Sequence, residues 1–349
     1  MKRITLNDIA AEVGVSKSVV YSVLNNREGK GIFFSKETKK KVTAVAKRLG
    51  YVSPKSAREF FTGKSDTIGI LIHKIIPPFS GILNHLQQEA WNHNLEITPY
   101  ITNGEPALEE HYLNIIRDRR VDAMIALVKT DGSAERYERF STDPCNLKIL
   151  LYHDPLVPGI PIVHFDALEA GRLAAEHLTA RGCRKLMFFG GSRDLARYQG
   201  FSKYLADKGF PPPETLTREG YTGFCNDGIS LGRELFDRKE LPDGIFASND
   251  LLAIGLIAEA QRRGLKVPGD ILIMGCDNIE IGACIYPSLT TIDINIPLLA
   301  QKLLTTVKEM IEEKPVPSAT YVPVNLVIRE STGLAETQKK PPTEIQTED

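Results

Sequence analysis

Three short stretches within the first fifty residues carry apolar positions at helical spacing. In the first stretch the apolar face is formed by Leu6, Ile9, Ala10 and Val13. Thr5 followed three residues later by Asp8 is typical of a helix N-terminus, and Gly14 suits the tight turn that ends the helix. The pattern therefore predicts a first helix that begins after Thr5 and ends at Gly14.

A second helix is predicted over residues 17–24 and a third over residues 36–49. Ser16 and Ser35 are expected to cap them, and Gly50 to end the third. The expected inner faces are Val19, Val20 and Val23 in the second helix, and Val42, Val45, Ala46 and Leu49 in the third. Two short helices joined by a Gly-Val-Ser turn indicate a helix-turn-helix, whose second helix enters the DNA major groove.

The N-terminal part of the second helix holds the candidates for base contacts. They are Lys17, Ser18, Tyr21 and Ser22. A lysine suits guanine acceptors, a serine suits either purine or pyrimidine edges, and a tyrosine can bond or pack against a thymine methyl group. A three-helix module that binds another protein is the alternative at this point.

The rest of the chain alternates between apolar runs and amphipathic segments. Strands are expected over 67–72, 95–101, 122–128, 147–152, 161–165, 185–189, 244–247, 271–275 and 289–293, and helices over 80–93, 106–119, 168–181, 194–208, 227–238, 250–263 and 296–313. Such alternation is typical of an α/β fold with parallel sheets and helices on both faces. About 270 residues is too long for one such sheet, so two lobes are expected.

Composition and charge narrow the function. The chain has 349 residues, 42% hydrophobic and 25% charged, which is typical of a soluble globular protein. Residues 1–65 have a net charge of +9, whereas the whole chain has −1. A basic head on an acidic body favours a polyanion as a partner of the head.

Other features exclude a membrane or secreted protein. No apolar run is long enough for a membrane helix, and the N-terminus turns acidic before any apolar signal segment. The five cysteines form no CxxC pair. They are interpreted as reduced thiols, which favours a cytoplasmic location.

Stretches that resemble catalytic motifs lack the flanking elements or the spacing that those motifs require. Residues 228–232 match the nucleophile-elbow pattern around Ser230, but a capped helix start precedes them where the motif needs a strand. Gly190-Gly191-Ser192 lacks the spacing of a phosphate-binding loop, and the seven histidines lack metal-ligand spacing. We therefore expect no enzyme activity, no cofactor and no metal.

Polar residues follow several of the predicted strands at their carboxyl ends, where open α/β sheets bind ligands. Arg197, Asn249 and Asp277 are the candidates. An arginine fork, an amide and a carboxylate can together bracket vicinal hydroxyl groups, and Phe79, Tyr152 and Phe224 could cover the apolar face of a ring. Two alternatives stay open: Asp250 as the N-cap of helix 250–263, and Arg197 as an interlobe salt bridge.

Several short stretches, in order along residues 4–334, resemble one family. They are residues 4–10, 14–16, 23–25, 35–38, 49–51, 57–58, 78–79, 119–122, 247–250, 275–277 and 287–291. Together they are similar to the lactose-repressor/galactose-repressor (LacI/GalR) family of bacterial transcription regulators. The resemblance implies a helix-turn-helix head, a hinge, and a body like a two-lobed periplasmic sugar-binding protein with three crossovers, near residues 162–166, 291–294 and 318–324.

The resemblance also implies roles for particular residues. The DNA-binding set is Thr5, Ser16, Lys17, Ser18, Tyr21, Ser22, Asn25, Lys55, Ala57, Arg58 and Phe60. Phe60 occupies the position of a leucine that wedges into the minor groove in this family, and phenylalanine is also a wedge residue. The effector-binding set is Pro78, Phe79, Tyr152, Arg197, Phe224, Asn249 and Asp277. Tyr152 stands where the family more usually has a carboxylate.

The expected organisation is a DNA-binding domain at 1–52, a hinge at 53–65, an effector-binding and dimerisation domain at 66–335, and a disordered tail at 336–349. Lobe one is expected at about 66–164 plus 293–320, and lobe two at about 165–290 plus 321–335. Helix 80–93, with Ile82, Leu83, Leu86 and Trp91, is the expected site of self-association.

The expected function is a sequence-specific transcriptional regulator, a repressor, that binds double-stranded operator DNA as a dimer. A small polar effector, a sugar or sugar derivative, is expected to control its operator affinity. A solute-binding or sensing protein without direct gene regulation is the alternative.

Overall fold

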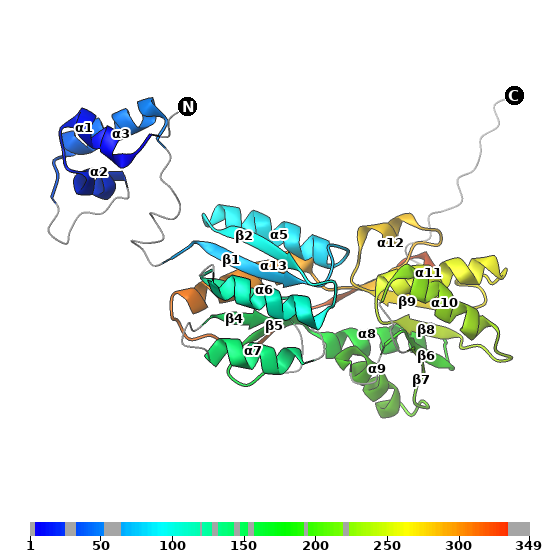
Figure 1. Cartoon of the computed structure of the whole chain (residues 1–349). Coiled ribbons are helices and arrows are strands. Elements are labelled where there is room, and N and C mark those ends of the chain that lie inside the picture. The colour runs from blue at the N-terminus through cyan, green and yellow to red at the C-terminus, as the bar shows by residue number, and fades with distance from the viewer. Residues whose placement is uncertain are drawn as a thin grey trace, which may run out of the picture. The chain divides into compact units, whose positions relative to one another are not determined.

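A computed structural model describes residues 4–24, 33–51, 64–118, 121–127, 132–142, 147–152, 157–191, 195–218 and 223–333. The chain divides into two compact units, residues 1–65 and 66–349 (Figure 1). Five of the expected DNA-contacting residues, Asn25, Lys55, Ala57, Arg58 and Phe60, lie outside the described residues, as do most of the expected hinge and the tail.

The first unit contains the three helices that its sequence predicts. They are α1 (Leu6–Val13), α2 (Lys17–Leu24) and α3 (Lys36–Leu49). Thr5 and Asp8 form a capping box on α1, Ser16 and Ser35 accept backbone N–H bonds at the starts of α2 and α3, and Gly14 has the positive φ that its turn requires. The predicted caps are therefore confirmed. A small core holds the helices together, made of Ile9, Val20, Val23, Val42 and Ala46.

Lobe one of the second unit is a six-stranded parallel sheet with strand order β11-β5-β4-β3-β1-β2. The strands are β1 (Thr67–Ile72), β2 (Glu96–Ile101), β3 (Ala123–Ala126), β4 (Ile149–Leu151), β5 (Ile162–Phe165) and β11 (Ala319–Val322). Its helices are α5 (Phe79–Asn92), α6 (Pro106–Asp118), α7 (Ser133–Thr142) and α13 (Ile296–Ile311). The central strands are buried along their whole length, which fits their apolar sequences.

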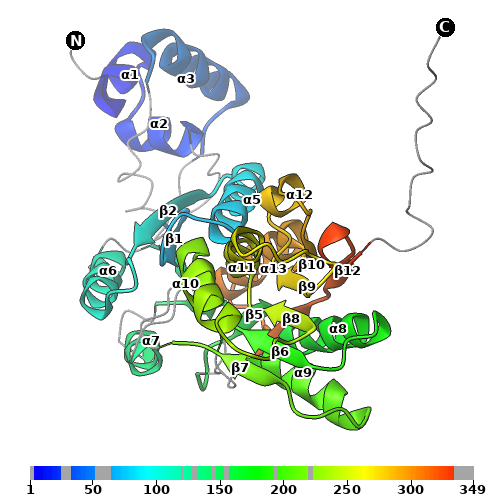
Figure 2. The same ribbon diagram turned by 90° about the vertical axis from the view of Figure 1, so that its right-hand side faces the viewer.

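Lobe two is a second six-stranded sheet, with order β12-β10-β9-β8-β6-β7 (Figure 2). Its strands are β6 (Leu186–Phe189), β7 (Glu214–Leu216), β8 (Gly244–Ala247), β9 (Leu272–Cys276), β10 (Thr290–Asp293) and β12 (Asn325–Val327). Its helices are α8 (Ala167–Ala180), α9 (Ala196–Asp207), α10 (Cys225–Phe236), α11 (Asp250–Arg262), α12 (Glu280–Cys284) and the short η1 (Glu330–Thr332). All pairs are parallel except β10 with β12, which is antiparallel.

The chain passes between the lobes three times. It leaves lobe one after β5, returns between β10 and α13, and leaves again between β11 and β12. These are the three places where crossovers are expected from the resemblance. The α/β class with two lobes is confirmed, and a buried apolar cluster continues through both.

Some elements differ from the sequence prediction. Helix α7, the short α12 and strands β7, β11 and β12 are not predicted, because their apolar runs are short or interrupted. Helix α5 also presents a different surface from the one expected. Ile82 and Leu86 are fully buried, since this face packs on the core, whereas Trp91 is 80% exposed. Of these residues, only Trp91 offers a large exposed apolar surface.

Candidate functional site

The head presents part of its predicted DNA-contacting set. Thr5, Ser16, Lys17 and Ser18 are exposed. Tyr21 and Ser22, expected to reach base edges, are only 7% and 5% exposed. Helix α2 has eight residues and packs against both α1 and α3, so its buried stripe is wider than the three valines that the pattern indicates. Tyr21 and Ser22 therefore contribute to the packing of the described head, and their contact with DNA stays a prediction.

Helix α3 carries much of the positive charge of the head. Lys41 and Arg48 are paired with Glu37 and Glu12. The other four lysines, Lys36, Lys39, Lys40 and Lys47, make no ion pair with any carboxylate in the described part of the chain. A helix with this many unneutralised ammonium groups favours contact with a polyanion.

In the second unit, candidate residues from both lobes come together at the carboxyl ends of the strands. Arg197, in the first turn of α9, donates to the carbonyl of Ser248, which follows β8. Its guanidinium also lies over the ring of Phe165, at the end of β5 in lobe one, with 5.5 Å from Cζ to the ring centroid. Asp277 follows β9 directly, and its φ of 129° is unusual for a residue with a side chain.

Electrostatic effects tie Tyr152 of lobe one to this group. Burial raises the pKa of the Tyr152 hydroxyl far above its ordinary value, the charge of Asp277 raises it further, and Arg197 opposes this. Burial likewise raises the pKa of the Asp277 carboxyl, Asp250 adds to the rise, and Arg197 lowers it. The sequence prediction that Tyr152, Arg197 and Asp277 share one site is consistent with these mutual effects.

Asn249 and Asp250 have different roles at the start of α11. Asn249 is the N-cap of α11, since its Oδ1 accepts the Leu252 N–H at 2.9 Å, and its amide donates to the Gly223 carbonyl at 3.1 Å. The reading of Asp250 as the N-cap is therefore wrong. Asp250 is fully buried and accepts bonds from the Thr291 hydroxyl at 2.6 Å and the Ile279 N–H at 2.9 Å.

The buried Asp250 depends on a glycine in the neighbouring strand. A Cβ at Gly275 would lie 2.2 Å from Asp250 Oδ1, so only glycine leaves room for the carboxylate here. Burial raises the pKa of Asp250 to about 6, although bonds from Thr291 and Ile279 lower it. Asp250 thus supports the loop that holds Asp277 rather than capping a helix.

Two of the three aromatic candidates, Phe79 and Tyr152, contact each other in lobe one, and the third, Phe224, lies in lobe two. The rings of Phe79 and Tyr152 meet edge to face at 6.3 Å, and Tyr152 lies 4.8 Å from His164. Pro78 precedes Phe79 at the start of α5. Phe224, before α10, lies under the ammonium of Lys74 at 4.9 Å from the ring centroid.

Arg197 is placed by an unusually close contact between two helices. A Cβ at Gly171 on α8 would lie 1.9 Å from the carbonyl oxygen of Arg197, and one at Gly200 on α9 would lie 1.9 Å from the carbonyl oxygen of Leu168. Both glycines therefore let α8 and α9 pack backbone against backbone. The start of α9, and with it Arg197, is fixed by this crossing.

Sequence reasoning missed Phe165, Lys74 and His164. The signal was present for Phe165 and Lys74, because Phe165 ends β5 and Lys74 follows the end of β1, as Arg197 and Asp277 follow β6 and β9. The described residues hold no group of three or more potential metal ligands. None of the described helices combines the length and apolar character needed to cross a membrane.

In the comparison with known proteins, each of the two units contains a segment that matches a family model. Residues 5–53 match the family model "Bacterial regulatory proteins, lacI family", and residues 175–332 match "Periplasmic binding protein-like domain". The chain is 29% identical over 335 residues to the ribose operon repressor of Halalkalibacterium halodurans, with 94% of this chain and 97% of the relative covered. It is 28% identical to the NTD biosynthesis operon regulator NtdR of Bacillus subtilis, with 94% and 99% covered.

A solved structure has the same fold over almost the whole chain. The lac repressor dimer bound to operator and the anti-inducer ONPF superimposes with a TM-score of 0.82 at 23% identity, covering 95% of this chain and all of that one. The curated relatives are repressors and operon regulators rather than enzymes, as expected from the failed catalytic motifs. The order of the two matched models and the similarity to curated repressors along 94% of the chain support a regulator of the LacI/GalR family, and the solved structure supports the same fold.

Proposed function

We propose that this protein is a cytoplasmic repressor that binds a specific operator as a homodimer. A small polar effector, a sugar or sugar derivative, binds between the lobes and changes the operator affinity. The proposed organisation is a DNA-binding domain at 1–52, a hinge at 53–65 and an effector-binding and dimerisation domain at 66–335. One observation carries the proposal: a capped, basic helix-turn-helix and a body whose candidate ligand residues come from both lobes occur in one chain.

The DNA contacts are assigned to the exposed start of α2 and its surroundings. Lys17 and Ser18 are exposed there, so both can reach base edges in a major groove. Thr5 and Ser16 are exposed as well, and are assigned to phosphate contacts beside their capping bonds. A dimer is proposed because one head has a small footprint, and a two-fold pair reads two half-sites.

The effector contacts are assigned to Arg197, Asp277, Tyr152 and the aromatic rings around them. Arg197 presents several donors in a fixed fork, and Asp277 offers acceptors, which suits adjacent hydroxyl groups. A carbohydrate is supported by the names of relatives, which include a ribose operon repressor and the sucrose operon repressor of Streptococcus mutans. A solute-binding protein without gene regulation is disfavoured by the basic head.

Coupling requires that the effector binds one arrangement of the lobes better than another. The three connections transmit a change between lobes to the segment that joins the body to the head. A coupling free energy of about 1–3 kcal/mol would change operator affinity by about 5–150-fold.

A gel shift with the Arg197→Ala variant tests the assignment of the effector site. The full chain is titrated onto DNA from upstream of its own gene, with and without candidate effectors. The variant is expected to bind the operator as the wild type does and to lose the response to effector, because its guanidinium no longer reaches the ligand. Arg238→Ala, which removes a surface pair with Glu214, is the matched control. A normal effector response in Arg197→Ala would refute the assignment.

A further inference from the structure

Two basic residues of lobe one follow β1 at its carboxyl end. They are His73 and Lys74, and Lys74 reaches across to lobe two, where its Nζ lies 4.9 Å from the ring centroid of Phe224. The neighbouring Gly223 accepts a bond from the amide of Asn249. Lys74 therefore lies against the same loop that the start of α11 holds in place.

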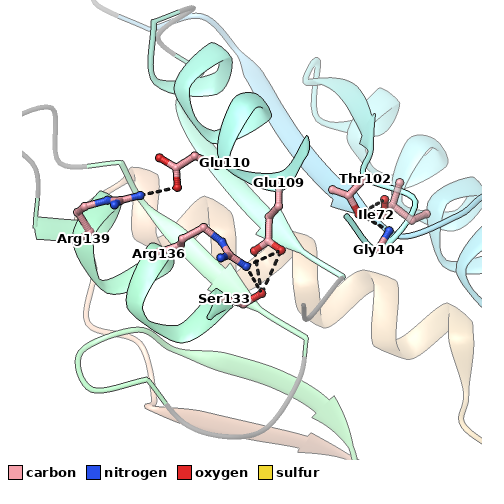
Figure 3. Close-up of polar contacts among 8 residues, drawn as sticks. All are labelled: Ile72, Thr102, Gly104, Glu109, Glu110, Ser133, Arg136 and Arg139. Carbon is pink, nitrogen blue, oxygen red and sulfur yellow. Dashed lines mark hydrogen bonds and ion pairs between the residues drawn. The ribbon is translucent and has the colours of Figure 1, made fainter. Parts of the chain in front are cut away.

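Hydrogen bonds hold the backbone just before Lys74, at Ile72 and His73. The Thr102 N–H donates to the Ile72 carbonyl and the Asn103 N–H donates to the His73 carbonyl, each at 2.9 Å. The Thr102 hydroxyl also bonds the Ile72 carbonyl and accepts the Gly104 N–H, as Figure 3 shows. A Cβ at Gly104 would lie 2.3 Å from His73 Cε1, so this glycine makes room for the imidazole.

No carboxylate of the described residues forms an ion pair with Lys74, and its recorded partner is an aromatic ring. A ring face attracts an ammonium group but does not neutralise its charge. Burial lowers the pKa of His73 and the charge of Lys74 lowers it further, which shows that the ammonium acts on its surroundings.

Lobe two adds a further cation, Arg197, together with the carboxyl groups of Asp250 and Asp277. The guanidinium of Arg197 contacts the Ser248 carbonyl and the Phe165 ring, while burial raises the pKa of both carboxyl groups. Tyr152 is neutral, because its pKa is raised by burial. The two described cations that face this region from different lobes, Lys74 and Arg197, therefore suit a ligand with negative charge.

We propose that the effector carries an anionic group, a phosphate or a carboxylate, and that Lys74 binds it when the lobes enclose the ligand. This rests on the proposed function and names the chemical class of its effector. An ammonium group is a compact charge with three donors, which suits an oxyanion, and exclusion of water strengthens the attraction. The ring of Phe224 then faces the carbon skeleton of the ligand.

The test is calorimetric titration of the full chain with a paired panel. Neutral sugars such as ribose and glucose are compared with ribose 5-phosphate, glucose 6-phosphate and glucuronate, and inorganic phosphate is titrated alone. At least one phosphorylated or carboxylated sugar is expected to bind more tightly than its neutral partner. Comparing the two sugar phosphates with glucuronate shows whether the anionic group of the ligand is a phosphate or a carboxylate.

Variants at Lys74 show whether binding of the ligand depends on the positive charge of this side chain or only on its size. Lys74→Gln is expected to weaken binding of the anionic ligand about tenfold or more, and Lys74→Arg to keep most of it. Lys302→Gln, an exposed lysine on α13, is the matched control, and circular dichroism checks that each variant is folded. The inference is overturned if no anionic compound binds, or if Lys74→Gln binds the anion as well as Lys302→Gln does. Operator binding by gel shift reports separately on the proposed function.

Discussion

At the scale of single residues, buried polar side chains attach the last described segment of the chain to lobe two. His177 on α8 bonds the Thr332 hydroxyl through Nε2 at 2.8 Å, and Thr332 bonds Thr290 at the same distance. The Ser331 hydroxyl donates to the Ile273 carbonyl at 2.6 Å. Element η1 is thus held by hydrogen bonds in a place where an unpaired polar group would be costly.

His177 makes this attachment sensitive to pH. Burial and, to a smaller extent, the charge of Arg181 together lower its pKa from the ordinary value of 6.5 to about 4. Between these two values the unfolded chain binds a proton that the folded chain does not. The contribution of neutral His177 is therefore complete above pH 6.5 and is lost as the pH falls towards 4, by up to about 3 kcal/mol.

The measurement is urea unfolding of the wild type and His177→Gln from pH 7.5 to pH 4.5. The difference in free energy of unfolding between the two proteins is expected to shrink as the pH falls. Comparing the two proteins is necessary because Asp250, with its raised pKa, changes stability in the opposite direction over part of this range. His111→Gln, at an exposed position, is the control. A difference that stays constant with pH would contradict this account.

At the scale of elements, α6 and α7 are joined by a buried carboxylate (Figure 3). Glu109 on α6 is fully buried and accepts bonds from the Ser133 hydroxyl at 2.8 and 3.0 Å. The guanidinium of Arg136 on α7 lies 3.3 Å from the same carboxylate. The next residue, Glu110, pairs with Arg139 at the surface. Two adjacent glutamates thus make one buried and one exposed contact between the same helices.

The two glutamates provide a matched pair of substitutions. Glu109→Ala is expected to lower the free energy of unfolding by about 3–5 kcal/mol, because it leaves the mostly buried Arg136 without its partner. Glu110→Ala is expected to cost under about 1 kcal/mol, since its pair is exposed to solvent. Urea unfolding at pH 7 measures both, and Glu109→Gln provides a milder variant. Equal costs for the two alanine variants would contradict the structural role of Glu109.

Sequence patterns predicted elements well wherever the pattern was local. The caps at Thr5, Ser16 and Ser35 lie within three residues of the bonds they make, so they could be read directly. Helix α7 was missed because only Tyr137 and Phe140 mark its inner face in a polar stretch, and its contact with Glu109 depends on residues 24 to 27 positions away.

The candidate site was predictable only in part. The rule that ligands meet the carboxyl ends of strands gave Arg197 and Asp277, which the structure brings to one region. The contact of Lys74 with Phe224 joins residues on different lobes, and no local pattern reports it. The cap of α11 at Asn249 is a local bond, whereas the burial of Asp250 depends on the space left at Gly275 in β9.

At the scale of the whole molecule, the positive charge and the candidate effector residues lie in different units of the chain. Net positive charge is concentrated in residues 1–65, while the candidate effector residues lie in the second unit, on two lobes that the chain joins three times. The proposed function assigns DNA and effector to separate units, and it therefore requires that the two sites be coupled through the connecting chain. Operator binding should also weaken steeply with salt, because phosphate contacts release counterions.

The most direct test measures the affinity of the full chain for the DNA upstream of its own gene and for a random duplex of equal length, by fluorescence anisotropy at several salt concentrations. The account predicts at least about a thousandfold preference for the upstream site and a steep loss of affinity for both duplexes as salt rises. Lys17→Ala should reduce the preference, since Lys17 is assigned to base edges. Equal affinity for the two duplexes, with and without candidate effectors, would contradict the central claim.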